Sequence, residues 1–262
     1  NHAVSDIYAM GGKPVTAMAV VTLPHATATA SRSMLMQLLG GAVAQLTEDG
    51  ITLVGGHTSE GMELSIGFVV NGVAKPDQLW RKAGMMTGDA LVLTRPLGSG
   101  ALFAADMQSS ARGEWVEVAI AQMLKSNRAA CAVLQQFEVH AATDVTGFGL
   151  AGHLAEMLQA SGKSAVIDLS RVPVLEGTQH VLAEGITSTL HAANKRSVAN
   201  LVAAPDAAAE ILFDPQTAGG LLVAVPEDQV VTLLAALHSA GYLAAARIGT
   251  VVNAMPSTIT VR

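Results

Sequence analysis

Apolar positions recur at helical spacing in several segments of the chain. Near the N terminus, apolar residues three or four apart over residues 3–10 are followed by Gly11-Gly12, which predicts a short helix with a stop signal. Ser31 is the predicted N-cap of a long amphipathic helix that reaches about Glu48. The same spacing predicts helices over residues 101–107, 115–137 and 227–240, and another that opens near Gly149.

Runs of β-branched and small apolar residues predict the strands. They lie at residues 15–23, 51–54, 64–74, 90–94, 139–142, 165–169, 221–225 and 247–252. Long strands flank one major helix in the first part of the chain, whereas short strands alternate with helices after residues 75–90. We therefore expect an α/β (α+β) protein, with an N-terminal domain at 1–80 and a C-terminal α/β layer domain at 81–262.

Composition narrows the classes of function. The net charge is −6 and no basic run occurs, so we expect no nucleic-acid partner. No apolar stretch is long enough to predict a membrane span. The single cysteine, Cys131, excludes an internal disulfide framework and is typical of a reducing compartment such as the cytoplasm. Cys131 lies in an apolar helical run, which indicates a buried packing residue.

Asp6 lies on the same face of the first predicted helix as apolar neighbours. A carboxylate in such a place is costly to bury unless it is paired or bound to a metal. The spacing alone leaves two interpretations open, a metal ligand and a solvated residue at the edge of the helix.

Gly55-Gly56-His57-Thr58 closes a short apolar strand. Glycines at such a point let backbone N–H groups approach an anion closely. An ordinary glycine-rich turn explains the same residues equally well.

Asp144 follows a strand, and Thr146-Gly147-Phe148-Gly149 then opens a helix. Amides at a helix N terminus favour phosphate, and an adjacent aspartate can hold the Mg²⁺ that accompanies it. The alternative is that Asp144 only caps the helix. Asp214-Pro215-Gln216-Thr217-Ala218-Gly219-Gly220 precedes another strand, and we interpret it as a buried polar loop that braces the site rather than a segment that contacts the ligand. No histidine pair has zinc-ligand spacing and no Walker A sequence occurs.

Four blocks in this order carry a resemblance to a known family. They are residues 1–12, 55–58, 144–150 and 213–222, supported by residues 93–100, in which Arg95 stands where the family usually has lysine. Together they closely resemble bacterial selenophosphate synthetase (selenide, water dikinase), in the superfamily of aminoimidazole ribonucleotide synthetase and thiamine-monophosphate kinase.

The resemblance implies a two-domain fold, in which the N-terminal half pairs with a second subunit to form a β-barrel. It implies a cytoplasmic homodimer that converts ATP, selenide and water to selenophosphate, AMP and phosphate. By motif match Asp6 and Asp144 would be Mg²⁺ ligands. Asp6 and the backbone of Gly55, Gly56 and His57 would bind ATP.

The family's nucleophile, a cysteine or selenocysteine, and its nearby lysine belong to a glycine-rich N-terminal segment that we expect before Asn1. We therefore expect this chain to be an N-terminally truncated form, inactive or weakly active. A second hypothesis is a non-catalytic dimerising or nucleotide-binding module of a larger polypeptide. A third substitutes thiamine monophosphate or an aminoimidazole precursor as substrate, and the Asp144 and Asp214 blocks together argue against it.

Overall fold

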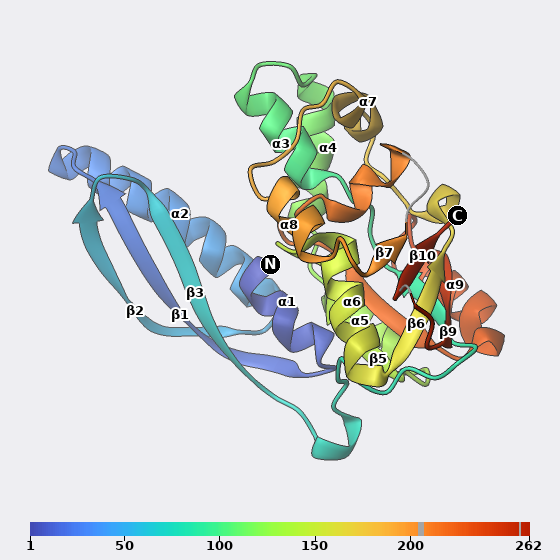
Figure 1. Ribbon diagram of the computed structural model, residues 1–262. Coiled ribbons are helices and arrows are strands. Elements are labelled where there is room, and N and C mark those ends of the chain that lie inside the picture. The colour runs from blue at the N-terminus through green and yellow to red at the C-terminus, as the bar shows by residue number, and fades with distance from the viewer. Residues whose placement is uncertain (204–206, 257) are drawn as a thin grey trace. The chain divides into compact units, whose positions relative to one another are not determined.

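The chain forms two compact units, Asn1 with Ala3–Leu79 (unit 1) and His2 with Trp80–Arg262 (unit 2). The computed structural model describes residues 1–203, 207–256 and 258–262, apart from the side chains of residues 207 and 208. Figure 1 draws unit 1 in blue to cyan and unit 2 largely in green to red. The two units are described separately below.

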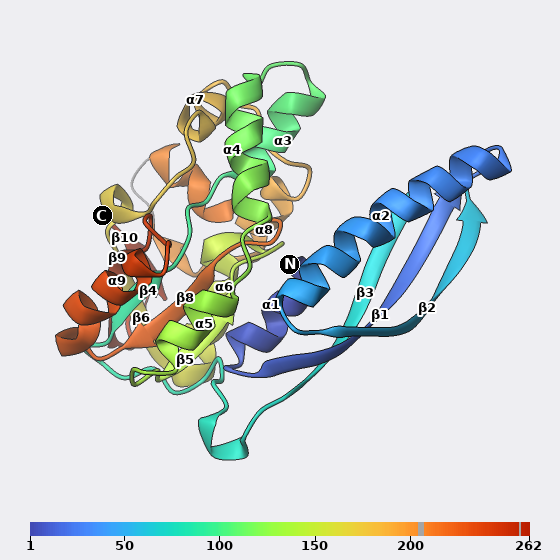
Figure 2. The same ribbon diagram turned by 180° about the vertical axis from the view of Figure 1, so that it is seen from behind.

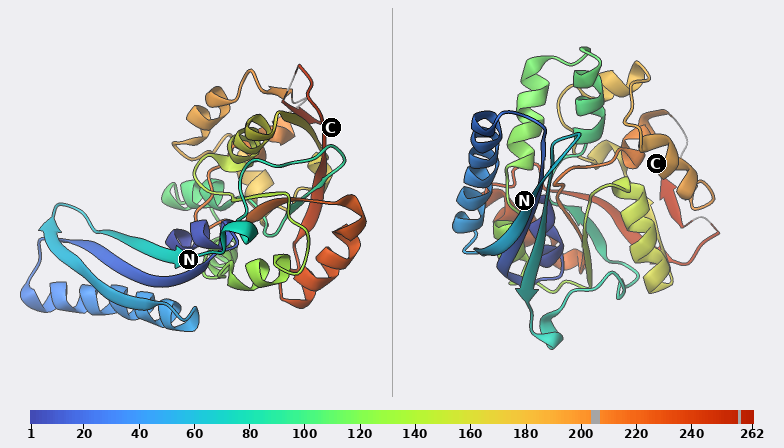
Figure 3. Two further views of the ribbon diagram at one scale, coloured as in Figure 1. Left: turned by 90° about the horizontal axis from the view of Figure 1, so that it is seen from below. Right: turned by 90° about the vertical axis from the view of Figure 1, so that its left-hand side faces the viewer.

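Unit 1 is a three-stranded sheet with helices. Its elements are α1 (His2–Ala9), β1 (Lys13–Pro24), α2 (Ala28–Glu48), β2 (Thr52–Gly61), β3 (Ser65–Val73) and the 3-10 turn η1 (Pro76–Gln78). The strand order is β2-β1-β3, with β1 parallel to β2 and antiparallel to β3. A β–α–β crossover explains the parallel pair, because α2 carries the chain back along the sheet (Figure 3, left).

Residues of β1 alternate between two environments. Ala17, Ala19 and Val21 are buried, whereas Met18 and Val20 are exposed on the opposite face. This alternation follows from the period of two in a strand, and it leaves one apolar face of the sheet uncovered in the single chain.

Two predictions for unit 1 are corrected by the structure. The long helix begins at Ala28 rather than at Ser31, because the side chain of Thr27 caps it by accepting a hydrogen bond from the backbone N–H of Ala30 (3.4 Å). Gly55-Gly56 forms no turn, since both residues lie inside β2 opposite Met18 and Ala19, next to a register shift.

Unit 2 is built on a seven-stranded sheet of order β5-β8-β4-β9-β6-β10-β7. Its strands are β4 (Ala90–Leu93), β5 (Ala141–Asp144), β6 (Lys163–Ile167), β7 (Val202–Ala203), β8 (Leu221–Val225), β9 (Ala246–Asn253) and β10 (Ile259–Val261). Its helices are α3 (Ser99–Met107), α4 (Gly113–Met123), α5 (Arg128–Leu134), α6 (Gly149–Ser161), α7 (Thr178–Ala183), α8 (His191–Ser197) and α9 (Val230–Ser239), with 3-10 turns η2 (Leu169–Arg171), η3 (Ala207–Phe213) and η4 (Glu227–Gln229). Along this order, each neighbouring pair among β5, β8, β4, β9 and β6 is antiparallel. The strand β10 is parallel to its two neighbours, β6 and β7.

The core of unit 2 lies on the face of the sheet covered by α6. Leu150, Leu154 and Leu158 of this helix pack with Leu91 and Leu93 of β4. The helices α5 and α9 contact each other on the other face (Figure 2). No helix in the described part of the chain combines the length and apolar character needed to cross a bilayer.

The single helix predicted over residues 115–137 is wrong, because two helices occupy this region. The helix α4 ends at Met123, and α5 begins at Arg128. In the break, the backbone carbonyl of Ser126 accepts a hydrogen bond from the Tyr242 hydroxyl (2.6 Å). A continuous apolar pattern does not reveal such a tertiary contact.

Candidate functional site

Asp144 ends β5, where it stands opposite Leu221 of β8. The residue is only 6% exposed, and its carboxylate forms no hydrogen bond or ion pair with any residue that the structure describes. The N-cap of α6 is Phe148, which makes no side-chain capping bond, so Asp144 does not cap this helix. A buried carboxylate without a hydrogen-bonded or ion-paired partner can bind a cation.

A short loop of residues 145–148 joins Asp144 at the end of β5 to the N terminus of α6. Gly149 starts α6 with φ at +69°, where a Cβ atom would also lie 2.9 Å from the carbonyl oxygen of Leu212. The hydroxyl of Thr146 is hydrogen-bonded to Nε2 of His153 one turn into the helix (3.2 Å). Uncapped amides at the start of a helix favour an anion such as phosphate.

The loop at residues 214–220 runs beside the Asp144 loop. The backbone N–H of Val145 donates to the carbonyl of Gly220 (2.9 Å), and that of Gln216 donates to the carbonyl of Thr146 (3.0 Å). The two blocks that we singled out in the sequence are thus joined through their backbones.

The interpretation of the 214–220 loop as a buried polar brace agrees with its contacts. The Gln216 side chain donates to Oδ2 of Asp214 (2.8 Å) and accepts from the backbone N–H groups of Gly98 (3.0 Å) and Ser99 (3.3 Å). Burial raises the pKa of Asp214 to about 7, although hydrogen bonds from Gln216 and from backbone amides in the first turn of α3 oppose this shift. Asp214 therefore secures α3 against the loop.

Arg95 is a buried cation that holds the same loop from the other side. Its guanidinium donates to the carbonyl oxygens of Gln122 (2.5 Å), Lys125 (2.8 Å), Ala218 (2.5 Å) and Gly219. Burial lowers its pKa to about 10, although the nearby Tyr242 and Asp144 oppose this shift. Arg95 consequently stays charged at neutral pH and places a positive charge near the Asp144 carboxylate.

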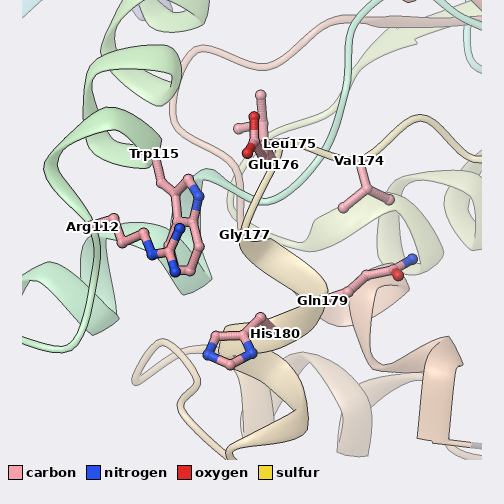
Figure 4. Close-up of a pocket in the computed structure, with 8 residues that line it drawn as sticks. All are labelled: Arg112, Trp115, Val174, Leu175, Glu176, Gly177, Gln179 and His180. Atoms are coloured by element: carbon pink, nitrogen blue, oxygen red, sulfur yellow. The ribbon is translucent and has the colours of Figure 1, made fainter.

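A cavity of about 520 Å³ also opens in unit 2, apart from these loops (Figure 4). Arg112 lies over the Trp115 ring, 5.2 Å from its centroid, and the imidazole of His180 meets the same ring edge-on. A larger cavity of about 790 Å³ is lined by Gly147 and Thr217 of the two loops, and by Phe103 of α3. The larger cavity is therefore the one that the candidate site adjoins.

The other predicted site residues lie in unit 1. Asp6 is exposed on α1. Gly55, Gly56 and His57 are consecutive and exposed on β2, an edge strand of the three-stranded sheet. A Cβ atom on Gly56 would lie 2.1 Å from the carbonyl oxygen of Ala19, so close approach of two strands explains this glycine.

Among the described residues, no three His, Cys, Asp or Glu side chains are grouped so as to hold a metal ion. Magnesium does not need such a cage, because it commonly binds one or two carboxylates together with phosphate oxygens and water. The buried carboxylate of Asp144, one short loop before the N terminus of α6, fits that kind of binding.

Sequence reasoning missed two residues that support the Asp144 loop, His153 and Asn194. His153 drew attention only as a possible zinc ligand, and no zinc spacing was present. Asn194 lies in α8, which the apolar pattern did not predict. A polar residue buried in a short helix leaves no periodic signal.

The chain matches two family models. These are "AIR synthase related protein, N-terminal domain" over residues 1–74 and "AIR synthase related protein, C-terminal domain" over residues 87–262. Among curated relatives, "Selenide, water dikinase" of Pelobacter propionicus is 41% identical over 96% of this chain and 73% of the relative. "Selenide, water dikinase 2" of Peptoclostridium acidaminophilum is 35% identical over 100% of this chain and 75% of the relative.

Solved structures show the same fold. Thiamine-monophosphate kinase from Stenotrophomonas maltophilia is similar with a TM-score of 0.74 at 22% identity, covering 98% of this chain and 75% of that one. HypE of E. coli, a hydrogenase maturation protein, gives a TM-score of 0.76 at 21% identity, covering 99% and 73%. These likenesses concern the fold alone.

Proposed function

Since the chain belongs to the selenide, water dikinase family of AIR synthase related proteins, and so to a family of phosphotransferases, we propose that it serves the synthesis of selenophosphate. In this reaction ATP, selenide and water give selenophosphate, AMP and phosphate. The observation that carries the proposal is the 41% identity to a relative of that name over 96% of the chain. We place the protein in the cytoplasm, in keeping with its single free cysteine.

In this proposal Asp144 of unit 2 and Asp6 of unit 1 are each assigned as magnesium ligands. The support for Asp144 is its burial without a hydrogen-bonded partner at the end of β5. A Mg²⁺ ion held there would neutralise phosphate oxygens while charge moves between them. The N terminus of α6 would bind a phosphate group through its backbone amides.

We assign contacts to ATP to Asp6 and to the backbone of Gly55, Gly56 and His57. Support comes from the position of β2 at an edge of its sheet, where backbone groups on the outer side can reach a ligand. A structural neighbour, the hydrogenase maturation protein HypE, has been solved in complex with ATP, so another protein of this fold binds this nucleotide.

We propose that unit 1 forms a homodimer through its uncovered sheet face. Met18 and Val69 are paired across β1 and β3, and both are exposed together with Val20. An apolar surface of this kind is typical of an interaction site. His57 lies on the same face, opposite Val20, so the proposed ATP contacts would adjoin the second subunit.

We assign no residue of this chain as the nucleophile. Cys131 is 3% exposed, and burial raises the pKa of its thiol to about 12. A polypeptide of these 262 residues alone is therefore expected to be inactive or weakly active. A non-catalytic dimerising or nucleotide-binding module is the alternative function.

The test is selenide-dependent formation of AMP from ATP, followed by chromatography of the nucleotides. It is made on the native polypeptide that carries these residues and on the 262 residues alone, with the relative from Pelobacter propionicus as positive control. We expect AMP formation by the native polypeptide and its loss in the Asp144→Asn variant. Binding of ATP by the native polypeptide without any selenide-dependent AMP would favour the non-catalytic module instead.

A further inference from the structure

Asn194 joins the two loops of the candidate site. Its side chain is almost fully buried, with the residue 7% exposed. The amide Nδ2 donates one hydrogen bond to the carbonyl oxygen of Gly147 (2.8 Å) and a second to that of Phe213 (3.1 Å). Gly147 belongs to the Asp144 loop, and Phe213 immediately precedes Asp214. Both protons of one amide are thus used to hold two segments together.

The helix that carries Asn194 is itself fixed to η3. His191 donates from Nε2 to Glu210 (2.8 Å), and Lys195 forms an ion pair with the same carboxylate. Burial tends to raise the pKa of Glu210, but the hydrogen bonds from Lys195 and His191 outweigh it and lower that pKa. The His191 ring also meets the Phe213 ring edge-on, with centroids 6.2 Å apart. These contacts flank Asn194 in the helix and fix the position of its amide.

Within the Asp144 loop, the contact with Asn194 matters most at Gly147. A Cβ atom at Gly147 would meet nothing within 4 Å, so its own packing restrains it little. Val145 and Thr146 are bonded through their backbones to the 214–220 loop, but the next residue along is held by Asn194. A glycine without such a contact has wide conformational freedom.

We propose that Asn194 is a positioning residue that fixes the Asp144 loop in the geometry required for a metal–phosphate group. The inference rests on the proposed function, because the ligand it serves is the one assigned to Asp144 and α6. Asn194 acts through the Gly147 carbonyl and does not touch the ligand.

The first experiment compares hydrogen exchange in the unliganded chain, by mass spectrometry, for Asn194→Ala and Arg196→Ala. Arg196 is exposed on the same helix and provides the matched control. We expect Asn194→Ala to speed exchange by about tenfold in peptides that contain residues 145–149, which corresponds to the loss of one or two ordinary hydrogen bonds. Because Asn194 also donates to Phe213, peptides next to that residue should exchange faster as well, whereas exchange in the rest of unit 2 should match that of Arg196→Ala.

The second experiment measures binding of Mn²⁺–ATP, with Mn²⁺ as a paramagnetic substitute for Mg²⁺, by electron paramagnetic resonance. Asp144→Asn reports on the proposed function and Asn194→Ala on the positioning role. We expect Asp144→Asn to abolish metal-dependent binding and Asn194→Ala to weaken it by about tenfold. If Asp144→Asn binds as the unaltered chain does, the assignment of Asp144 fails while the exchange result still decides the role of Asn194.

Unchanged exchange at residues 145–149 in Asn194→Ala overturns the proposal, and so does faster exchange spread evenly over unit 2, which indicates a merely structural role. Should Asn194→Ala fail to fold, Asn194→Ser replaces it. A serine hydroxyl can serve only one of the two carbonyls, so a smaller increase confined to the same peptides supports the proposal and none contradicts it.

Discussion

A Cβ atom on Gly219 would lie only 2.0 Å from the carbonyl oxygen of Val145. The contact joins the 214–220 loop to the Asp144 loop, and only glycine permits it without displacing one of them. The φ angle of Gly219 is not among the positive values in the chain, so steric contact and not backbone conformation selects this residue.

We therefore expect Gly219→Ala to force the two loops apart. The cost should be about 1–3 kcal/mol in the free energy of unfolding, as for other overpacked interiors. Urea unfolding followed by circular dichroism measures it. Gly113→Ala is the matched control, because a Cβ there meets nothing within 4 Å and the residue begins α4. A similar loss in both variants would contradict the steric argument.

Replacement of Arg95 should destabilise unit 2 strongly. Arg95→Met removes the guanidinium donor from four carbonyl oxygens. Those of Gln122 and Gly219 keep a second donor, the backbone N–H of Lys125 and the side chain of Asn127, whereas a buried acceptor left unpaired costs about 1–3 kcal/mol. Arg95→Lys keeps the charge with fewer donors, so its midpoint of urea unfolding should lie between those of the unaltered chain and Arg95→Met. Equal midpoints for the two variants would show that charge contributes nothing beyond the hydrogen bonds.

The architecture of both units could be predicted from periodicity, but the residues that connect the segments could not. The strand at Leu221–Val225 is predicted with its observed bounds because a short apolar run between glycines and proline is unambiguous. The break between α4 and α5 was missed, since the carbonyls of Gln122 and Lys125 accept from the distant Arg95. Propensity carries no information about such long-range hydrogen bonds.

In the candidate site, too, local sequence patterns could be predicted and long-range contacts could not. Asp144 could be singled out as a candidate because a carboxylate between a strand and a glycine-rich helix start has a local pattern. Gly56 was interpreted as part of a turn because the sequence does not show that the Ala19 carbonyl lies against it. Asn194 makes contacts 47 and 19 residues away in the chain, which no local window contains.

Cys131 should be chemically inert in the folded chain. Because burial raises the pKa of its thiol to about 12, almost no thiolate exists at pH 8. Iodoacetamide should label it slowly in buffer and completely in 6 M guanidinium, as measured by intact mass. Rapid labelling of the folded chain would contradict its burial.

The uncovered sheet face of unit 1 predicts a change of oligomeric state. Val20→Asp places a charge at its centre, where Val20 is 51% exposed in the single chain, and should shift a dimer to monomers in sedimentation velocity. Val231→Asp is the matched control, because this valine of α9 is 81% exposed in unit 2. Dimers that persist in Val20→Asp, or are lost equally in both variants, would exclude this face as the interface.

His140 should make the stability of unit 2 depend on pH. Its Nδ1 donates to the Asp89 carboxylate (2.9 Å) and its Nε2 to Oε1 of Glu138 (3.1 Å). Burial lowers the pKa of His140, but the hydrogen bonds and charges of Asp89 and Glu138 outweigh it and raise that pKa above its usual value of about 6.5.

Because the folded state binds the His140 proton more tightly than the unfolded state, the stabilisation is complete below about pH 6.5 and is lost as the pH rises through the raised value. The difference in the free energy of unfolding between the unaltered chain and His140→Ala should therefore shrink between about pH 6 and pH 9. Urea unfolding at half-unit intervals of pH measures this difference. The exposed His25, whose contact with Glu60 (3.7 Å) lies at the surface, is substituted to alanine in the same way as the control. A difference for His140→Ala that grows with pH would mean that burial, and not the two carboxylates, controls the titration of His140.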